Sequence, residues 1–309
     1  MSTLKVGTIR HNSATSDAIT TSANGTCTAH ITNNLSNRNI ILNGGMTCSQ
    51  RGSSFSNLTN HYCLDRFKFR NSNGISGTFT VSQSTESPDG FGNSLKVDVA
   101  SADSAIGAAE VFNIGTKLEG QDLQRLAKGT SGAKKSVLSF YVKTNKSGLY
   151  TVRIYDRDNG RNVSGSYTVS NANWNRYSVT FPADASGKLD DDNNSSLEFF
   201  WHLVGGSDIT SGSLQTTWAA SSDAGAATGQ VNLGDAINNA WEITGIQLET
   251  GSRATAFEHE PISASLAKCQ RYFHKELYPT GPGPFSMNYV DSHRFFHLYH
   301  PTTMRTTPT

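Results

Sequence analysis

The sequence predicts an all-β protein: a two-sheet jelly-roll β-sandwich with an extended N-terminal arm and a short C-terminal helix-plus-strand segment. Two observations predict this fold. Apolar residues make up 36% and charged residues 17% of the 309-residue chain, and Ser, Thr, Asn and Gly are abundant. That composition is typical of short strands joined by polar turns. Short segments with alternating apolar and polar residues also recur along most of the chain, which is long enough to bury a large core.

Residues 1–36 are expected to form an arm that needs a partner surface. Short alternating runs surround residues 4–9 and 27–31, and polar spacers separate them. The segment has too few apolar residues to bury a core of its own. A disordered tail is the alternative interpretation.

Residues 37–260 carry the strand signals of the predicted sandwich. In "RYSVTFPA", Tyr177, Val179 and Phe181 share one face, and Pro182 sits at a strand end, where its missing N–H does no harm. A helical interruption is predicted at residues 119–127. Further strand candidates are "NIILN", "LDRFKF", "GTFTVSQ", "SLKVDVA", "SLEFFWHLVGG" and "WEITGIQLE".

The clearest pair of strands is "SVLSFYVKT" and "LYTVRIYD", joined by "NKSG". In the first, Leu138, Phe140 and Val142 share one face. In the second, Val152 and Ile154 point inward. Alternation on both sides of a Gly-containing turn predicts a β-hairpin.

Residues 261–309 are predicted to form a short helix and a distal β segment. The helix follows Pro261, with Ser263 or Ser265 as its N-cap. Its apolar side is expected to carry Leu266, Cys269 and Tyr272 or Phe273. "HRFFHLYHP" is a further strand candidate, so this region resembles the start of a small domain or a segment completed by another chain.

Charge and composition exclude several classes of partner. The formal net charge of +1 provides no field for nucleic acid or an anionic membrane surface. No segment approaches the roughly 20 apolar residues that span a bilayer. The first residues contain no apolar run of the signal-peptide type, so we expect no export by the standard route. Cys27, Cys48, Cys63 and Cys269 are expected to be small buried hydrophobes rather than ligands or disulfides.

Catalytic and metal motifs are also missing from the sequence. It contains no HExxH, G-x-S-x-G, P-loop or G-x-G-x-x-G pattern, and it predicts no catalytic residue and no cofactor. The acidic stretch "KLDDDNNSS" is a weak calcium candidate through Asp190, Asp191 and Asp192. A solvated turn is the favoured interpretation, because Asp and Asn favour turns and the regular ligand spacing is absent.

Four residues are candidates for contact with a carbohydrate, because a sugar ring has an apolar face that stacks on aromatic side chains. Trp218 lies in a polar stretch and is expected to be the most exposed tryptophan, whereas Trp201 is in phase with core residues. Tyr141, Arg153 and Tyr155 are expected to form an outward-facing strip. Exposed aromatic residues also occur at subunit contacts, which is the alternative interpretation.

Three stretches carry a family resemblance. "NIILNGGMTCSQRG" followed by "LDRFKF" contains Asn43–Gly44, Gln50–Arg51–Gly52 and Asp65–Arg66–Phe67. "LEGQDLQRLAKGTSGAKKSVLSFYVKTNKSGLYTVRI" and "ITGIQLETGSRATAFEHEPISASLAKCQRYF" follow in the middle and at the end. Together they resemble phage tail fibre and virion appendage proteins with a carbohydrate-binding-module-like jelly-roll domain, of the marine and cyanobacterial phage type.

The resemblance implies a non-enzymatic virion structural protein, assembled in the host cytoplasm. We expect residues 1–36 to bind other virion proteins, the chain to form a homotrimer, and the sandwich to contact host-surface polysaccharide. Arg51, Asp65 and Arg66 are expected to form a structural ion-pair or hydrogen-bond set at the base of the sandwich. A capsid decoration protein, a stand-alone carbohydrate-binding module and a glycan depolymerase are the alternatives.

Overall fold

The computed structural model of the chain describes residues 6–275, except 14, 16, 26, 30–35, 57–58 and 73, together with residues 288–290, 293–295 and 300–307. The chain divides into two compact units, Met1–Arg38 and Asn39–Thr309. The limits of the three regions inferred from the sequence stay predictions.

The first unit contains a small antiparallel sheet. Its strands lie in the order β1 (Thr8–Ile9), β2 (Ile19–Thr21) and β3 (Cys27–Ala29). The side chain of Ile9 is 53% exposed, so this sheet does not bury its apolar residue within the unit. So small a sheet needs further packing to be stable, and the attachment role expected of this segment stays a prediction.

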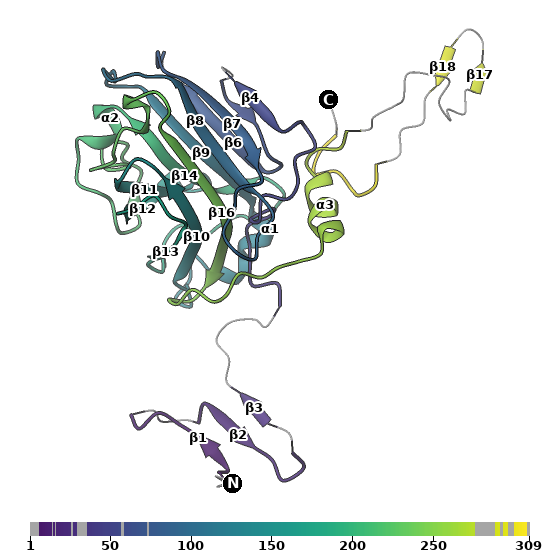
Figure 1. The fold of residues 1–309 in the computed structure, drawn as a ribbon. Coiled ribbons are helices and arrows are strands. Elements are labelled where there is room, and N and C mark those ends of the chain that lie inside the picture. The colour runs from purple at the N-terminus through teal and green to yellow at the C-terminus, as the bar shows by residue number, and fades with distance from the viewer. Residues whose placement is uncertain are drawn as a thin grey trace. The chain divides into compact units, whose positions relative to one another are not determined.

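The second unit is a sandwich of two antiparallel sheets, as the sequence predicts (Figure 1). Within the described residues, one sheet has six strands in the order β13 (Asn175–Phe181), β10 (Ser136–Thr144), β16 (Ala240–Thr250), β8 (Ser94–Ser101), β7 (Thr78–Ser84) and β4 (Ser54–Ser56). The other has seven, in the order β15 (Ala219–Ala220), β12 (Arg161–Val169), β11 (Gly148–Asp156), β14 (Ser195–Gly205), β9 (Val111–Glu119), β6 (Phe67–Ser72) and β5 (His61–Tyr62).

The chain crosses repeatedly between the sheets, for example from β8 to β9 and from β13 to β14, which gives the jelly-roll connectivity. The predicted hairpin of β10 and β11 is wrong for the same reason. β10 pairs with β13 and β16, whereas β11 pairs with β12 and β14. The apolar faces of β10 and β11 line opposite walls of one core, and alternation along each strand is the same in either arrangement.

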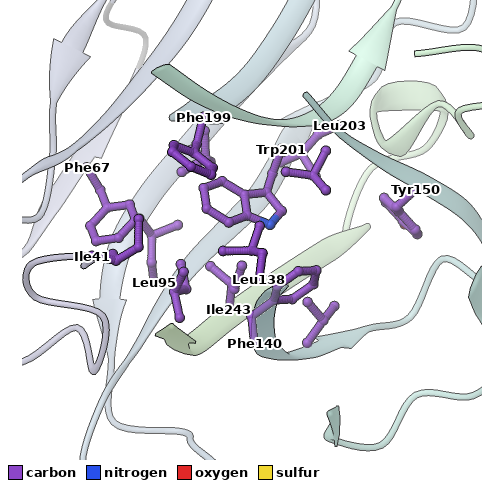
Figure 2. Close-up of a cluster of buried hydrophobic side chains, with 14 of the residues drawn as sticks. Ile41, Phe67, Leu95, Leu138, Phe140, Tyr150, Phe199, Trp201, Leu203 and Ile243 are labelled. Carbon is purple, nitrogen blue, oxygen red and sulfur yellow. The ribbon is translucent and has the colours of Figure 1, made fainter. Parts of the chain in front are cut away.

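The core lies between the sheets and is rich in aromatic residues (Figure 2). Trp201 on β14 is fully buried, as predicted, and its ring meets that of Phe140 on β10 edge to face, with the centroids 5.9 Å apart. Tyr177, Val179 and Phe181 face the interior with increasing burial, as their alternation predicts. Close packing of this kind fixes the separation and register of the sheets.

The stretch "NIILN" is not a strand of either sheet, although it was a strand candidate. It instead runs beside β16: Ile40 N–H donates to the carbonyl of Leu248 (3.0 Å), and Ile246 N–H donates to that of Gly44 (2.9 Å). A Cβ on Gly44 would lie 2.0 Å from the oxygen of Ile246, so only glycine permits this approach. The segment thus fastens the start of the sandwich to a strand from its end.

Short helices interrupt the strands. The predicted helical interruption is present as α1 (Gly120–Leu123) and the 3-10 turn η1 (Gln124–Leu126). The others are α2 (Ser207–Thr210) and the 3-10 turn η2 (Leu233–Asp235). Cys48, Cys63 and Cys269 are buried free thiols, as predicted, and the side chain of Cys27 lies outside the described residues.

The C-terminal helix α3 (Ile262–Gln270) begins as predicted after Pro261, but neither serine caps it. Pro261 is the N-cap, and Ser265 instead donates to Glu260 Oε1 (2.7 Å) from a buried position. Beyond it, β17 (Asn288–Val290) pairs with β18 (His293–Phe295), and residues 276–287, 291–292 and 296–299 lie outside the described set. None of the helices formed by the described residues has the length and apolar character needed to cross a membrane.

Candidate functional site

The outward face of the seven-stranded sheet holds a groove of about 190 Å³. Strand register explains which side chains meet there. Lys68 on β6 lies opposite Gly115 on β9, which lies opposite Phe200 on β14. The groove is lined by Asn60, Tyr62, Lys68, Arg70, Asn113, Gly115, Thr116, Lys117, Glu198 and Phe200.

Gly115 makes room for the ring of Phe200 in the floor of this groove. A Cβ at position 115 would lie 3.1 Å from Cδ1 of Phe200 and 2.6 Å from the carbonyl oxygen of Phe199. The ring can therefore lie over the bare backbone of β9. Phe200 is half-buried, and together with Tyr62 it presents aromatic surface within a polar groove.

Cations outnumber carboxylates in the groove. Glu198 is buried and forms ion pairs with Lys117 and with Arg157 (Nη1 to Oε1, 3.1 Å). Lys68 and Arg70 form no ion pair with a carboxylate of the described residues. Burial and the charges of Lys117 and Arg70 hold the pKa of Lys68 below its usual value, and Glu198 only partly opposes them.

Buried polar atoms without protein partners lie in the adjacent row of the same face. Asn113 is 1% exposed and His202, opposite it, is 3% exposed. Within the described residues, Asn113 Oδ1 and both ring nitrogens of His202 have no hydrogen-bond partner. Burial, with the charges of Arg153 and Arg70, lowers the pKa of His202 to about 3, so its imidazole is neutral at pH 7.

The predicted outward strip does not exist as one surface. Arg153 and Tyr155 lie on β11 of the seven-stranded sheet, but Tyr141 lies on β10 of the other sheet, beside Phe91 (ring centroids 5.4 Å). The prediction placed the three residues on one hairpin, but β10 and β11 belong to different sheets. Arg153 is also buried, and its guanidinium donates to Asp223 (2.8 Å) and Ser221 (2.6 Å).

Trp218 lies outside the groove and is half-buried rather than exposed. Its indole N–H donates to the carbonyl of Pro182 (3.0 Å), and Lys128 Nζ lies 4.7 Å from its ring centroid. Lys128 is buried and forms ion pairs with Asp156 and Asp184 (3.0 Å to the latter). Trp218 therefore packs over a buried charge cluster.

The acidic loop with Asp190, Asp191 and Asp192 is an irregular, bent segment between β13 and β14. Both carboxylate oxygens of Asp192 accept from Asn194, and Asp190 N–H donates to Asp158 (3.0 Å). Over the described part of the chain, no group of three or more His, Cys, Asp or Glu side chains is placed to hold a metal ion.

The predicted structural set is brought together only in part. Asp65 is buried and accepts from Gln50 Nε2 (2.8 Å), with Arg51 Nη1 3.4 Å from its other oxygen. Arg66 instead donates to the carbonyl of Lys117 and lies over the ring of Tyr272, 3.4 Å from its centroid. Arg66 thus belongs to a neighbouring contact with the C-terminal segment.

That C-terminal segment is docked on the sandwich through arginines. Arg271 donates to both carboxylate oxygens of Glu119, at 2.9 and 3.1 Å. Burial alone would raise the pKa of Glu119, but the hydrogen bonds from Arg271 and other neighbours leave it below the usual value. Arg51 also lies 3.7 Å from the ring centroid of Phe273. A second cavity, of about 270 Å³, has Tyr272 and Arg305 of the C-terminal segment in its lining.

Sequence reasoning missed the groove, chiefly because it missed β9. The stretch "VFNIGTKLE" alternates, but Asn113 and Gly115 lower its strand propensity. A glycine within an alternating run is a signal for close approach of other groups, and that signal was present at Gly115.

No protein-family model matches the sequence, and no curated protein does. Similar solved structures include the enzymatically active domain of tailspike protein 4 of bacteriophage CBA120, at 11% identity and a TM-score of 0.37, covering 69% of this chain but only 22% of that one. A putative sugar binding protein from Bacteroides thetaiotaomicron has 12% identity, a TM-score of 0.38, and coverage of 69% and 100%. A family 11 carbohydrate-binding module of a Clostridium thermocellum cellulase has 12% identity, a TM-score of 0.35, and coverage of 64% and 95%.

Proposed function

We propose that the chain is a non-enzymatic virion structural protein, a tail fibre or appendage component that contacts host-surface glycans through its sandwich. It attaches to other virion proteins through residues 1–36 and acts as a homotrimer. The sequence resemblance to virion appendage proteins supports the location. The division of the chain into a small N-terminal unit and a large sandwich agrees with an attachment arm and a contact head.

The groove on the seven-stranded sheet is the observation that carries the glycan contact. A sugar has an apolar ring face and a rim of hydroxyl groups, so its binding sites combine aromatic surface with a few placed polar groups. Phe200 and Tyr62 provide the aromatic surface. Asn113, Lys68 and Lys117 provide the polar groups. Asn113 Oδ1 has no hydrogen-bond partner among the described residues, so a sugar hydroxyl that reaches it would satisfy it.

The same groove argues against hydrolysis. A glycoside hydrolase needs a carboxylic acid kept protonated beside the scissile bond and a second carboxylate at a defined distance. Glu198 is the single carboxylate in the groove lining, and two cations contact it. The groove is thus suited to binding rather than to proton transfer.

The glycan contact can be tested by substituting Phe200. Phe200→Ala removes the stacking surface, and we expect binding to host-surface polysaccharide, measured by affinity electrophoresis of the full chain, to weaken about tenfold or more. Tyr141→Ala is the matched control, because it removes a half-buried aromatic from the outer face of the opposite sheet. Loss of binding in Tyr141→Ala but not in Phe200→Ala would refute the assignment of this groove.

The virion location needs a separate experiment. We expect antibody-labelled gold to mark the tails of intact phage particles. Labelling spread over the head would favour capsid decoration. Glycan binding by a chain absent from particles would favour a stand-alone carbohydrate-binding module.

A further inference from the structure

The cavity between the sandwich and the C-terminal segment is strongly basic. It adjoins the groove, because Tyr62 and Lys117 line both. The cavity is lined by Arg51, Tyr62, Arg66, Lys117, Leu118, Glu119, Asn193, Ser195, Tyr272 and Arg305. Four of these residues are cations and one is a carboxylate, Glu119, which already accepts hydrogen bonds from Arg271 (2.9 and 3.1 Å) and from Gln121 Nε2 (2.5 Å).

The positive charge is concentrated at this cavity and is not a property of the whole chain. The whole chain has a formal net charge of only +1. Arg66 and Arg305 form no ion pair with a carboxylate of the described residues, and neither do Lys68 and Arg70 in the adjoining groove. The cavity and the groove share Tyr62 and Lys117, and four of the six cations that line them form no ion pair with a carboxylate of the described residues.

Arg66 is held in a position that leaves a donor unused. It is only 7% exposed, and its Nε has no hydrogen-bond partner among the described residues. Its backbone has φ +72°, in the left-handed region that non-glycine residues seldom occupy. Strain of this kind persists where the surroundings hold a side chain in a required place, and it clusters at ligand sites. Ser195 Oγ, in the same lining, is also buried and has no hydrogen-bond partner in the part of the chain that the structure describes.

Burial is the main cause that lowers the pKa of Arg51 and of Lys68, and neighbouring cations add to it. Burial lowers the pKa of Arg51, and the charge of Arg66 lowers it further, although Asp65 and Tyr62 act in the opposite direction. The lowered pKa of Lys68 has burial and the neighbouring cations as its causes. A bound anion would relieve the repulsion among these cations.

We propose that the glycan bound by this protein is an anionic polysaccharide, and that an oxyanion on one of its sugars enters the basic cavity while a neighbouring ring lies on Phe200. Guanidinium groups suit this role because they donate parallel hydrogen bonds to carboxylate, sulfate or phosphate oxygens. The inference rests on the proposed glycan contact and adds the charge class of the ligand.

The test compares charged and uncharged forms of the same polymer. The full chain is titrated by calorimetry with polygalacturonate, with its fully methyl-esterified form, with dextran sulfate and with dextran. We expect binding of polygalacturonate at least about tenfold tighter than of the esterified polymer. Binding of polygalacturonate alone assigns the oxyanion to a carboxylate, and binding of dextran sulfate as well extends the site to sulfate.

Variants locate the charge. Arg305→Gln and Lys68→Gln lie at the two ends of the surface and are partly exposed, so we expect both to fold normally by thermal melting and to weaken polygalacturonate binding about tenfold. Lys143→Gln on the opposite sheet is the control and should change binding less than about twofold. Equal weakening in Lys143→Gln would mean a general charge effect and would overturn the cavity as the site.

The failures of the two proposals look different. If charged and uncharged polymers bind equally and Phe200→Ala abolishes both, the anionic class is wrong and the glycan groove stands. If no polymer binds, and host-surface polysaccharide does not bind either, the glycan proposal itself fails and the anionic class fails with it.

Discussion

Removing the carboxylate of Asp65 should measurably destabilise the sandwich. The side chain is 2% exposed and accepts a 2.8 Å hydrogen bond from Gln50 Nε2, with Arg51 Nη1 at 3.4 Å. Asp65→Ala removes both contacts. It also leaves the guanidinium of Arg51, which is 20% exposed, without a carboxylate partner.

The magnitude follows from these contacts. A hydrogen bond to a buried charged group contributes about 1.5–3 kcal/mol. Burial raises the pKa of Asp65 despite its partners, so desolvation offsets part of that gain, and Arg51 keeps its stacking on Phe273. We therefore expect a loss of about 2 kcal/mol in the free energy of unfolding, or roughly 4–8 °C in Tm for a unit of this size.

The assay is thermal unfolding of the full chain at pH 7, followed by circular dichroism. Asp98→Ala is the matched control. Asp98 is 37% exposed and pairs with Lys96 at 2.9 Å on the surface, so its removal should cost less than about 1 kcal/mol. Asp65→Asn keeps the shape and an acceptor oxygen, and its cost should fall between wild type and Asp65→Ala. The reasoning fails if Asp65→Ala has the same Tm as Asp98→Ala, or if Asp65→Asn lowers the Tm more than Asp65→Ala does.

Three further predictions concern docking, the groove and assembly. Because the folded-state pKa of Glu119 is lowered, its ion pair with Arg271 contributes stability above the unfolded-state pKa, near 4.5, that is lost as pH falls further. The stability difference between wild type and Glu119→Gln, measured by urea unfolding, should therefore shrink on acidification from pH 6 to 3, and a constant difference would contradict the pairing. Gly115→Val should displace Phe200, reduce glycan binding and cost about 1–3 kcal/mol; a variant with unchanged binding would place the contact elsewhere. Light scattering of the full chain should give about three times the 33.3 kDa chain mass, and a monomer mass would refute the trimer.

The two-sheet architecture could be predicted from the sequence because alternation is a local property. Phe140 and Trp201 were placed in the core correctly, since each lies in phase with other apolar residues of its own strand. Strand partners are a non-local property. The alternation of β10 and β11 is identical for a hairpin and for two strands facing across a core, and only the fit of both sheets decides between them.

The candidate site depended on the same non-local information. Phe200, Gly115 and Lys68 become neighbours only through the strand order β14-β9-β6, which no local pattern encodes. The set of Arg51 and Asp65 was predicted from a sequence resemblance, and these two residues do meet. Arg66 turns away because Tyr272, more than two hundred residues later in the chain, stacks on its guanidinium.

The attachment of residues 39–44 to β16 has a mechanical consequence. If the arm is anchored and the groove holds a glycan, as proposed, tension would reach the sandwich at residue 39. When that tension acts along the segment, the bonds of Ile40 to Leu248 and of Gly44 to Ile246 are sheared together rather than peeled one after another. The Asn39 side chain, which donates to the carbonyl of Ile246 (3.0 Å) and accepts from the N–H of Leu248 (3.1 Å), would resist the same tension, so the first residue of the sandwich is bonded most firmly where a pull on the preceding chain would act.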